Sequence, residues 1–212
     1  MSNEAVTKKY IQDGEKFPIG SHSTIKKLIG TKKTVLDVGC AGGELGAFCN
    51  DNIFYGIDGN AEALKSASKL YEKVELVDLN QIPEKEIFET KFDVIVFADV
   101  LEHLLDPEKI LKHFKKYLKE DGIIIVSLPN VALWRVRLNL IFGKFDYTDY
   151  GVMDRTHLHL YTFKTAKELL SNSGFKVTNQ LGASYSFGNW INNSLKFFQE
   201  LFSVHIVSVG KK

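Results

Sequence analysis

The chain has 212 residues, of which 44% are hydrophobic and 25% are charged, and its formal net charge is +1. These values are typical of a single globular domain, expected here over residues 1–212, and they give no electrostatic reason to expect a nucleic-acid polymer as partner. No apolar run approaches the roughly 20 residues that cross a bilayer, and residues 1–16 lack the apolar core of a signal peptide. With only two cysteines, Cys40 and Cys49, a cytoplasmic location is expected.

The N-terminal segment, residues 1–30, is polar at first and then predicts a short amphipathic helix. His22–Ile29 has its apolar residues on one side and ends at Gly30.

Thr34–Gly46, with the sequence TVLDVGCAGGELG, predicts a strand, a glycine-rich turn and the start of a helix. Val35, Leu36 and Val38 are typical of a strand buried on both faces of a parallel sheet. The glycines let the backbone turn sharply and let a ligand approach it closely. Since ligands of α/β proteins gather at the carboxyl ends of the strands, this loop is a candidate nucleotide site.

The loop departs from the dinucleotide pattern G-x-G-x-x-G because Asp37 precedes its glycines. A carboxylate there would repel a pyrophosphate and could accept hydrogen bonds from an ammonium group. The segment resembles the first motif of class I S-adenosylmethionine-dependent methyltransferases, E/D-x-G-x-G-x-G, with alanine at the usual middle glycine. The resemblance implies that the methionine end of the cofactor binds to Asp37, Gly39, Cys40, Ala41 and Gly43. A structural turn without a ligand is the alternative.

Asp58 follows the second predicted strand, Ile53–Ile57, about twenty residues beyond the glycine loop. Nucleotide-binding folds place a carboxylate there on the ribose hydroxyls, so Asp58, with its neighbour Gly59, is a candidate for the ribose. The alternative is a turn aspartate in the sequence IDGN. A helix is expected next, over Ala61–Tyr71.

The third predicted strand, Val74–Val77, leads into the sequence VDLN. The same resemblance implies that this turn flanks the adenine through Asp78, Leu79 and Asn80. It also implies that the N-terminal segment closes over the cofactor, which makes Tyr10 a possible contact or an ordinary packing aromatic.

Strands and helices continue to alternate in the middle of the chain. Phe92–Ala98 is the most apolar strand and is expected at the centre, Asp106-Pro107 predicts the start of a helix, and Gly122–Leu128 is the fifth strand after an Asp-Gly turn. This alternation predicts a doubly wound parallel sheet.

The last third predicts a helix over Thr162–Asn172, strands over Phe175–Leu181 and Val204–Val209, and a Phe-rich helix over Ile191–Phe202. We therefore expect an α/β, Rossmann-like fold with a mostly parallel seven-stranded sheet and one antiparallel edge strand, as the resemblance also implies.

The sequence DVLEH, after the fourth strand, contains candidate groups for chemistry. It resembles the V-L-E-H motif of methyltransferases related to ubiquinone-pathway O-methyltransferases. In that comparison Ala98 and Asp99 line the floor near the sulfonium. His103 and His157 are our candidates for activating the acceptor as general bases, and His159 is a further polar candidate.

The same segment also resembles a small-RNA end-modifying group, in which E-x-x-E-H and a distant histidine bind a divalent metal. The matching positions here are Asp99, Glu102, His103 and His157. The sequence leaves open whether a metal binds or whether Glu102 and His103 only organise the start of a helix.

Val131–Thr162 is rich in aromatics and resembles a segment of bacterial methyltransferases associated with surface-polysaccharide glycosyltransferases. We expect residues 131–162 to form a lid on the acceptor side, with Asp154 and Arg155 as a structural pair. Arg135 and Arg137 could contact a membrane surface or a phosphate. The aromatic side chains that either form an apolar lid or pack on the domain are Trp134, Phe142, Phe145, Tyr147 and Tyr150.

The sequence thus predicts an enzyme that transfers the methyl group of S-adenosylmethionine to oxygen or nitrogen of a small-molecule or carbohydrate-like acceptor. Three alternatives are a catalytically silent cofactor-binding subunit, a methyltransferase acting on RNA ends, and an NAD-dependent oxidoreductase. The low net charge argues against the RNA substrate, and the glycine spacing argues against NAD.

Overall fold

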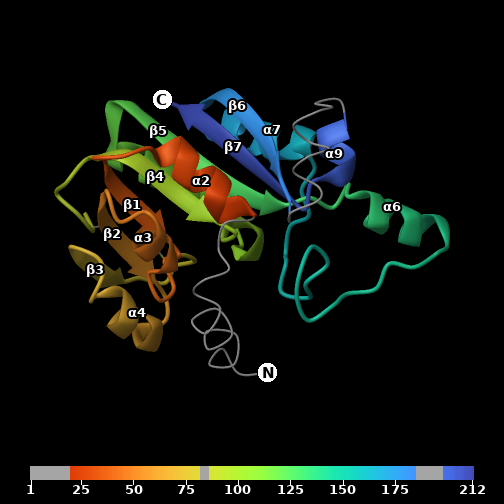
Figure 1. Ribbon diagram of the computed structural model, residues 1–212, viewed down its shortest axis with the longest axis horizontal. Coiled ribbons are helices and arrows are strands. Elements are labelled where there is room, and N and C mark those ends of the chain that lie inside the picture. Colours follow the sequence, from red (N-terminus) through yellow and green to blue (C-terminus); the bar gives the residue numbers. More distant parts are fainter. Residues whose placement is uncertain (1–19, 82–85, 185–197) are drawn as a thin grey trace.

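The computed structural model describes residues 20–81, 86–184 and 198–212, which form a seven-stranded sheet with helices on both faces (Figure 1). The strand order is β3-β2-β1-β4-β5-β7-β6. The strands are β1 Thr34–Val38, β2 Ile53–Asp58, β3 Lys73–Leu76, β4 Phe92–Ala98, β5 Leu118–Pro129, β6 Lys176–Ala183 and β7 His205–Lys211. Tyr10 and most of the predicted helix Ile191–Phe202 lie outside the described residues.

The predicted mostly parallel sheet is confirmed. Every neighbouring pair from β3 through β5 is parallel, whereas β7 is antiparallel to both β5 and β6. The expected antiparallel strand is therefore β7, and it lies one place inside the edge because β6 takes the outermost position.

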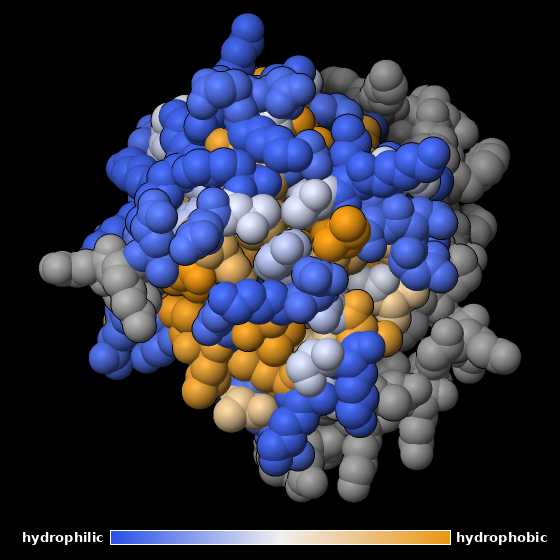
Figure 2. All heavy atoms as spheres, turned by 90° about the vertical axis from the view of Figure 1, so that its left-hand side faces the viewer, coloured by the Kyte–Doolittle hydropathy of each residue, from blue (hydrophilic) through white to orange (hydrophobic). Residues whose placement is uncertain are grey.

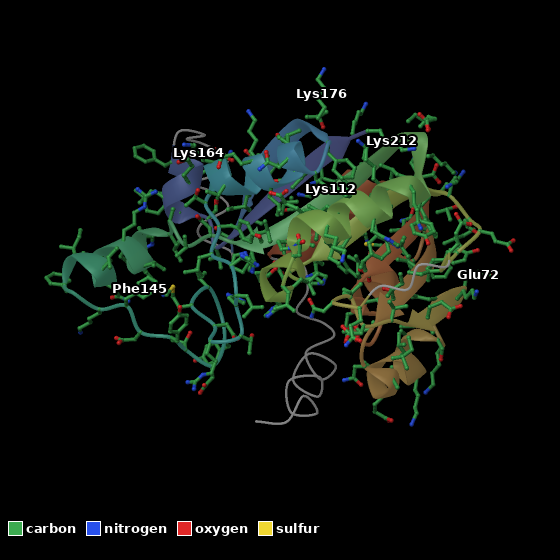
Figure 3. All side chains as sticks on the ribbon, turned by 180° about the vertical axis from the view of Figure 1, so that it is seen from behind. Glu72, Lys112, Phe145, Lys164, Lys176 and Lys212 are labelled. Carbon is green, nitrogen blue, oxygen red and sulfur yellow. The ribbon has the colours of Figure 1, made fainter. Side chains whose placement is uncertain are left out.

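The helices are α2 Ser21–Ile29, α3 Glu44–Phe48, α4 Ala61–Ala67, α5 Pro107–Phe114, α6 Trp134–Ile141, α7 Phe163–Asn172 and α9 Gln199–Phe202. α2, α3 and α4 pack on one face of the sheet, whereas α5 and α7 cover the other, which faces the viewer in Figure 3. In the described parts of the chain no helix has both the length and the apolar character needed to cross a membrane.

The alternation of side chains along β1 explains why its apolar run is unbroken. Val35 joins the core beneath α2, where it shares a cluster with Ile25, and Leu36 joins the opposite core with Ile110 of α5. Both strand residues are completely buried. A strand covered on both faces in this way needs apolar side chains at successive positions.

Two predicted helix starts are confirmed by their caps. The carboxylate of Asp106 accepts a hydrogen bond from the Lys109 amide at 3.0 Å, with Pro107 as the first helical residue. Thr162 caps α7 in a reciprocal arrangement with Thr165. Side-chain oxygens at these positions satisfy amides that have no partner inside the helix.

Two predicted boundaries are wrong. α4 ends at Ala67, not at Tyr71, because Tyr71 turns inward toward β1. The predicted turn at Asp121-Gly122 lies inside β5, which begins at Leu118; the irregularity in its pairing with β4 accommodates these residues.

The free edge of the sheet at β3 is short, with only four residues, and an ion pair between Lys73 and Glu75 lies on it. Figure 2 views the molecule from this side, where hydrophilic side chains predominate around a smaller apolar area. Short, charged edges hinder pairing with a strand of another chain.

Candidate functional site

The candidate site lies where the strand order reverses, between β1 and β4. β1 pairs in parallel with β2 on one side and with β4 on the other, so the loops that follow these strands leave from the same edge of the sheet. A crevice outside the carboxyl ends of strands at such a point is where open α/β sheets bind ligands.

The glycine loop is held to β2 by its own backbone. The amides of Gly39 and Cys40 both donate to the Ile57 carbonyl, at 2.7 and 3.0 Å, and the Ala41 amide donates to the Asp58 carboxylate at 2.8 Å. Gly39 and Ala41 have φ values of 79° and 44°. Alanine thus occupies a left-handed conformation that favours glycine, so the loop keeps its shape at some cost in strain.

Asp37 is buried beneath the loop and is bound by Tyr71. The Tyr71 hydroxyl donates to the Asp37 carboxylate at 2.7 Å and accepts the amide of Gly46 at 3.1 Å, so the pair braces the start of α3. Burial raises the pKa of Asp37 to about 7 although the Tyr71 hydrogen bond acts in the opposite direction. Tyr71 was not predicted as a site residue, because it stands at the end of the predicted helix Ala61–Tyr71.

The Cys40 side chain faces away from the loop opening. Its sulfur is buried, and a Cβ atom at Gly56 would lie 2.7 Å from it, so this thiol packs against β2. Any contact of Cys40 with a cofactor would therefore come from its backbone.

Asp58 forms the turn expected for the sequence IDGN and also holds the glycine loop. One carboxylate oxygen accepts the amide of Asn60 at 2.8 Å, as in a turn, and the other accepts the amide of Ala41. The side chain is half-buried at the end of β2. Gly59 beside it is exposed, with no atom closer than 3.7 Å to an added Cβ, which leaves open space next to the carboxylate.

The turn after β3 is connected to the loop after β4. The Asp78 carboxylate accepts the amide of Asn80 at 2.9 Å, and the Asn80 side chain accepts the amide of Leu105 at 2.9 Å. Leu79 between them is buried, whereas Asp78 and Asn80 are exposed. Three predicted cofactor contacts therefore form one turn at the same edge of the sheet.

Asp99 follows the half-buried Ala98 in a left-handed conformation, with a φ of 54°. Its carboxylate accepts hydrogen bonds from Ser127 of β5 at 2.7 Å and from Ser21 of α2 at 3.3 Å, and His205 lies 3.8 Å away. Asp99 is thus directed to α2 and the neighbouring strands.

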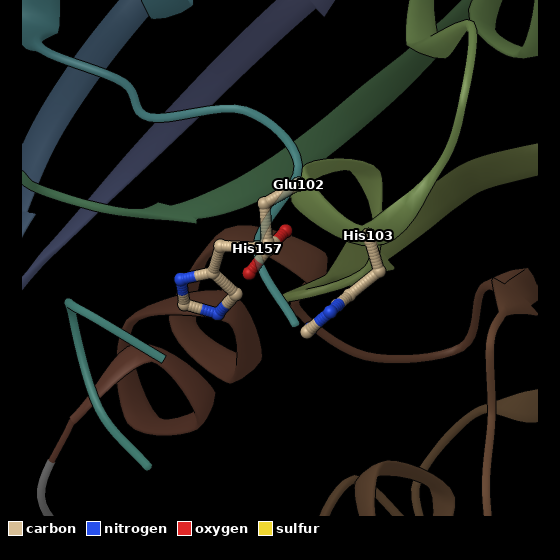
Figure 4. Close-up of side chains that lie close together, drawn as sticks. All are labelled: Glu102, His103 and His157. Carbon is tan, nitrogen blue, oxygen red and sulfur yellow. The ribbon is translucent and has the colours of Figure 1, made fainter. Parts of the chain in front are cut away.

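Glu102, His103 and His157 form a group that we call the histidine cluster (Figure 4). One donor atom from each lies within 4.8 Å of the other two, and the two imidazole rings are 4.8 Å apart between centroids. Three of the four predicted metal-binding candidates therefore come together. The fourth, Asp99, does not belong to the group that the structure brings together.

Glu102 is completely buried, and among the described residues neither of its carboxylate oxygens has a hydrogen-bond partner. Burial raises its pKa well above the ordinary value, and the charge of Asp99 raises it further. The side chain does not organise a helix start through its carboxylate. A buried carboxyl without partners is either protonated or neutralised by a cation.

His157 has a lowered pKa, chiefly through burial and secondly through the neighbouring His103. Its Nδ1 atom lies 3.2 Å from the Val152 carbonyl. A carbonyl only accepts, so the neutral ring carries its proton on Nδ1 and keeps a lone pair on Nε2. His159 lies apart from the cluster, with its Nε2 atom 3.0 Å from the Leu104 carbonyl.

The predicted lid extends away from the sheet. α6 has no buried residue, and Phe145 lies far from the sheet in Figure 3. The predicted pairing of Asp154 with Arg155 is wrong, because Arg155 binds Asp149 at 2.7 Å. The exposed large apolar side chains of this segment are Trp134, Leu138, Leu140, Ile141, Phe142, Phe145, Tyr147, Tyr150 and Leu158.

The sequence of the chain is similar to those of known proteins. Residues 15–180 match the family described as a methyltransferase domain. A ubiquinone biosynthesis O-methyltransferase of Actinobacillus pleuropneumoniae is 36% identical over 124 residues, covering 53% of each chain. The human mitochondrial protein of the same name is 28% identical over 202 residues, which is 87% of this chain and 53% of that one. The chain spans about half the length of these curated relatives.

Solved structures agree in fold. A SAM-dependent methyltransferase from Aquifex aeolicus superimposes with a TM-score of 0.60 at 19% identity, covering 95% of both chains. A TehB-like SAM-dependent methyltransferase from Corynebacterium glutamicum gives a TM-score of 0.61 at 18% identity, covering 99% of this chain and 100% of that one.

Proposed function

The chain belongs to the family of methyltransferase domains and has the class I fold, with S-adenosylmethionine as cofactor, and from this we propose that it methylates oxygen or nitrogen of a small-molecule or carbohydrate-like acceptor. One observation carries the proposal: the glycine loop follows β1, and Glu102 and His103 of the histidine cluster follow the adjacent parallel strand β4, so both leave the same edge of the sheet. Relatives named for O-methylation in ubiquinone biosynthesis favour oxygen on a small molecule.

The charge of the loop suits this cofactor. Thr34–Gly46 contains Asp37 and Glu44 but no lysine or arginine, and Asp58 adds a third carboxyl at the same edge. Such a site attracts a ligand with a sulfonium and an ammonium group and repels the pyrophosphate of NAD. The proposed contacts are Asp37, Gly39, Cys40, Ala41 and Gly43 for the methionine end, Asp58 and Gly59 for the ribose, Asp78, Leu79 and Asn80 for the adenine, and Ala98 and Asp99 for the floor.

We assign acceptor activation to His103 and His157. S-adenosylmethionine would supply an electrophilic methyl group to the acceptor oxygen or nitrogen, and the Nε2 atom of His103 or His157 would take up the proton that this acceptor atom loses. The lowered pKa of His157 keeps this ring neutral and able to accept a proton near pH 7. Alignment of the reacting atoms supplies much of the rate, so loss of the base should slow the reaction without abolishing it.

A divalent metal at the cluster is a second possibility, favoured by the unpaired carboxylate of Glu102. Glu102, His103 and His157 would hold it, and nitrogen ligands beside a carboxylate suit manganese or zinc better than magnesium. Such an ion would orient an acceptor hydroxyl and lower its pKa. Elemental analysis of the purified protein, before and after chelation, decides between the protonated and the metal-bound cluster.

Calorimetric titration with S-adenosylmethionine, with NADH in parallel, tests the cofactor. Micromolar binding of S-adenosylmethionine that is lost in Asp58→Ala supports the assignment and justifies an acceptor screen. Tight binding without product for any acceptor would favour a silent subunit, retention on RNA at physiological salt would favour an RNA substrate, and binding of NADH alone would overturn the proposal.

We further propose that residues 131–162 form the acceptor-side lid and touch a membrane surface, while the protein itself is cytoplasmic, in keeping with its free buried cysteines. Residues 131–145 carry Arg135, Arg137 and Lys144 and no acid, among exposed apolar side chains. Cations and apolar groups together favour an anionic bilayer surface. Flotation of the protein with anionic vesicles should weaken in Phe142→Ser. It should not weaken in the control Ile53→Ser, which alters an exposed apolar residue outside this segment. Equal flotation of the wild type and both variants would contradict the membrane contact.

A further inference from the structure

The turn Asp154–His157 touches both histidines of the cluster. Its last residue is His157 itself, and its third residue, Thr156, contacts the ring of His103. These contacts connect segments 53 residues apart in the sequence. The histidine that follows β4 is therefore held by the segment that delivers the second histidine.

Two oxygen atoms of Thr156 meet one nitrogen atom of His103. The Nδ1 atom lies 3.2 Å from the Thr156 carbonyl and 3.1 Å from its hydroxyl oxygen. The hydroxyl gives its proton to the Asp154 carboxylate at 2.7 Å, so toward the ring it acts as an acceptor. Both oxygens thus require a proton on Nδ1, which leaves the Nε2 atom of a neutral His103 with its lone pair.

Asp154 holds the turn at three points. Besides the Thr156 hydroxyl, its carboxylate accepts the Thr156 amide at 2.8 Å, and its carbonyl accepts the His157 amide at 3.1 Å. One aspartate therefore fixes the residue that contacts His103 and the backbone that carries His157. The neighbouring Arg155 is directed elsewhere, to Asp149.

We propose that Thr156 and Asp154 are positioning residues that hold His103 in the Nδ1-protonated tautomer, with its Nε2 atom available to the reacting group. This inference rests on the proposed role of His103. Free histidine prefers the opposite tautomer, so the turn must supply the preference. With the Val152 carbonyl acting in the same way on His157, both rings present an unprotonated Nε2 atom. Either a proton from the acceptor or a divalent ion would require this arrangement.

The tautomer is measured directly by nitrogen-15 NMR of the histidine side chains at a pH where His103 is neutral, with His103→Gln to assign the signal. We expect an unprotonated Nε2 atom in the wild type, in Thr156→Ser, which keeps the hydroxyl, and in Thr148→Val, whose hydroxyl binds the Tyr150 carbonyl instead. In Asp154→Ala, which releases the turn, the opposite tautomer should become populated, and in Thr156→Val, which loses the hydroxyl and keeps the backbone carbonyl, it should rise to a smaller but measurable extent. A protonated Nε2 atom in the wild type, or identical spectra for Thr156→Ser and Thr156→Val, would overturn the inference.

Kinetics give a second readout. Thr156→Val should lower kcat about tenfold with little change in KM for S-adenosylmethionine, as expected for a residue behind a reacting group, and Thr156→Ser should restore it. An unchanged kcat in Thr156→Val would count against the inference. If the wild type transfers no methyl group to any acceptor, the proposed function fails, and the NMR comparison still decides the positioning role.

Discussion

Gly39, the first residue of the loop, lies close against Val100, so an added Cβ atom would lie 2.5 Å from that side chain. Gly143 has a similar φ, 72° against 79°, but an added Cβ would meet nothing within 4 Å. Gly143→Ala should therefore lower the free energy of unfolding by about 1–2 kcal/mol, since only the left-handed backbone is unfavourable for alanine. Gly39→Ala should lower it by about 1–3 kcal/mol more, because the added methyl group also overpacks the site. Urea unfolding of both variants measures the difference, and equal losses would contradict the Val100 contact.

Asp37 gives a prediction about pH. Its pKa in the folded protein is about 7, against 3.8 for an ordinary aspartate, so between these values the folded state holds a proton that the unfolded chain releases. Retention of this proton stabilises the folded state. The stabilisation is fully present below the pKa of the unfolded chain and is lost as the pH rises through about 7, with a slope of up to about 1.4 kcal/mol per pH unit.

Asp37→Asn should remove that dependence, because the amide does not titrate and can still accept the Tyr71 hydroxyl. The free energy of unfolding of the wild type should therefore fall relative to Asp37→Asn between pH 5 and pH 8. Parallel curves for the two proteins would show that the Asp37 pKa is not raised. If the ionised carboxylate holds the cofactor ammonium, affinity for S-adenosylmethionine should rise over the same range in the wild type alone.

Among the elements, α5 depends on a cap that is local in sequence. Asp106→Ala removes the acceptor for the Lys109 amide and should destabilise the protein by about 1 kcal/mol. Asp106→Asn keeps an oxygen at the same place and serves as the control. Thermal unfolding of the two variants should separate them, whereas equal destabilisation would assign the effect to the lost charge.

Local signals of this kind explain which elements could be predicted. The strand Phe92–Ala98 was predicted with its observed bounds. The starts of α5 and α7 could be predicted because each capping residue lies within four positions of the amide that it binds. The start of β5 was predicted wrongly at Asp121-Gly122, because whether these residues form a turn or part of the strand depends on how β5 pairs with β4. Sequence patterns report the periodicity of one segment and not the register between two.

That the candidate site residues lie at one edge of the sheet was predictable, whereas their contacts were not. The acids and glycines after β1, β2 and β3 indicated one edge of the sheet, since parallel strands end together. Asp37, Asp99 and His103 contact Tyr71, Ser127 and Thr156, which lie 28 to 53 positions away, and Asp99 also contacts Ser21, 78 positions away. No spacing rule connects such residues, so only the folded chain identifies them.

At the scale of the whole molecule, most of the proposed cofactor contacts lie in three loops on one edge of the sheet, after β1, β2 and β3. A ligand that binds only the folded state stabilises it by about 2.7 kcal/mol at a concentration 100 times its Kd. Binding should therefore slow amide hydrogen exchange in segments 37–46, 58–60 and 78–80 together. The Ala41–Asp58 hydrogen bond links the first two segments, and the amide of Val77, which directly precedes the third, donates to the Asp58 carbonyl at 3.0 Å.

The protruding segment 140–150 supplies the internal control, because its residues are exposed and its ribbon lies away from these loops in Figure 1. We expect S-adenosylmethionine alone to leave its exchange unchanged, and an acceptor added afterwards to protect it if it closes as a lid. NADH should protect none of the segments, since the carboxyls of the loop repel a pyrophosphate. Protection by S-adenosylmethionine confined to the last of the three loops would mean that Asp37 and Asp58 do not hold the cofactor, and the glycine loop would then be a structural turn.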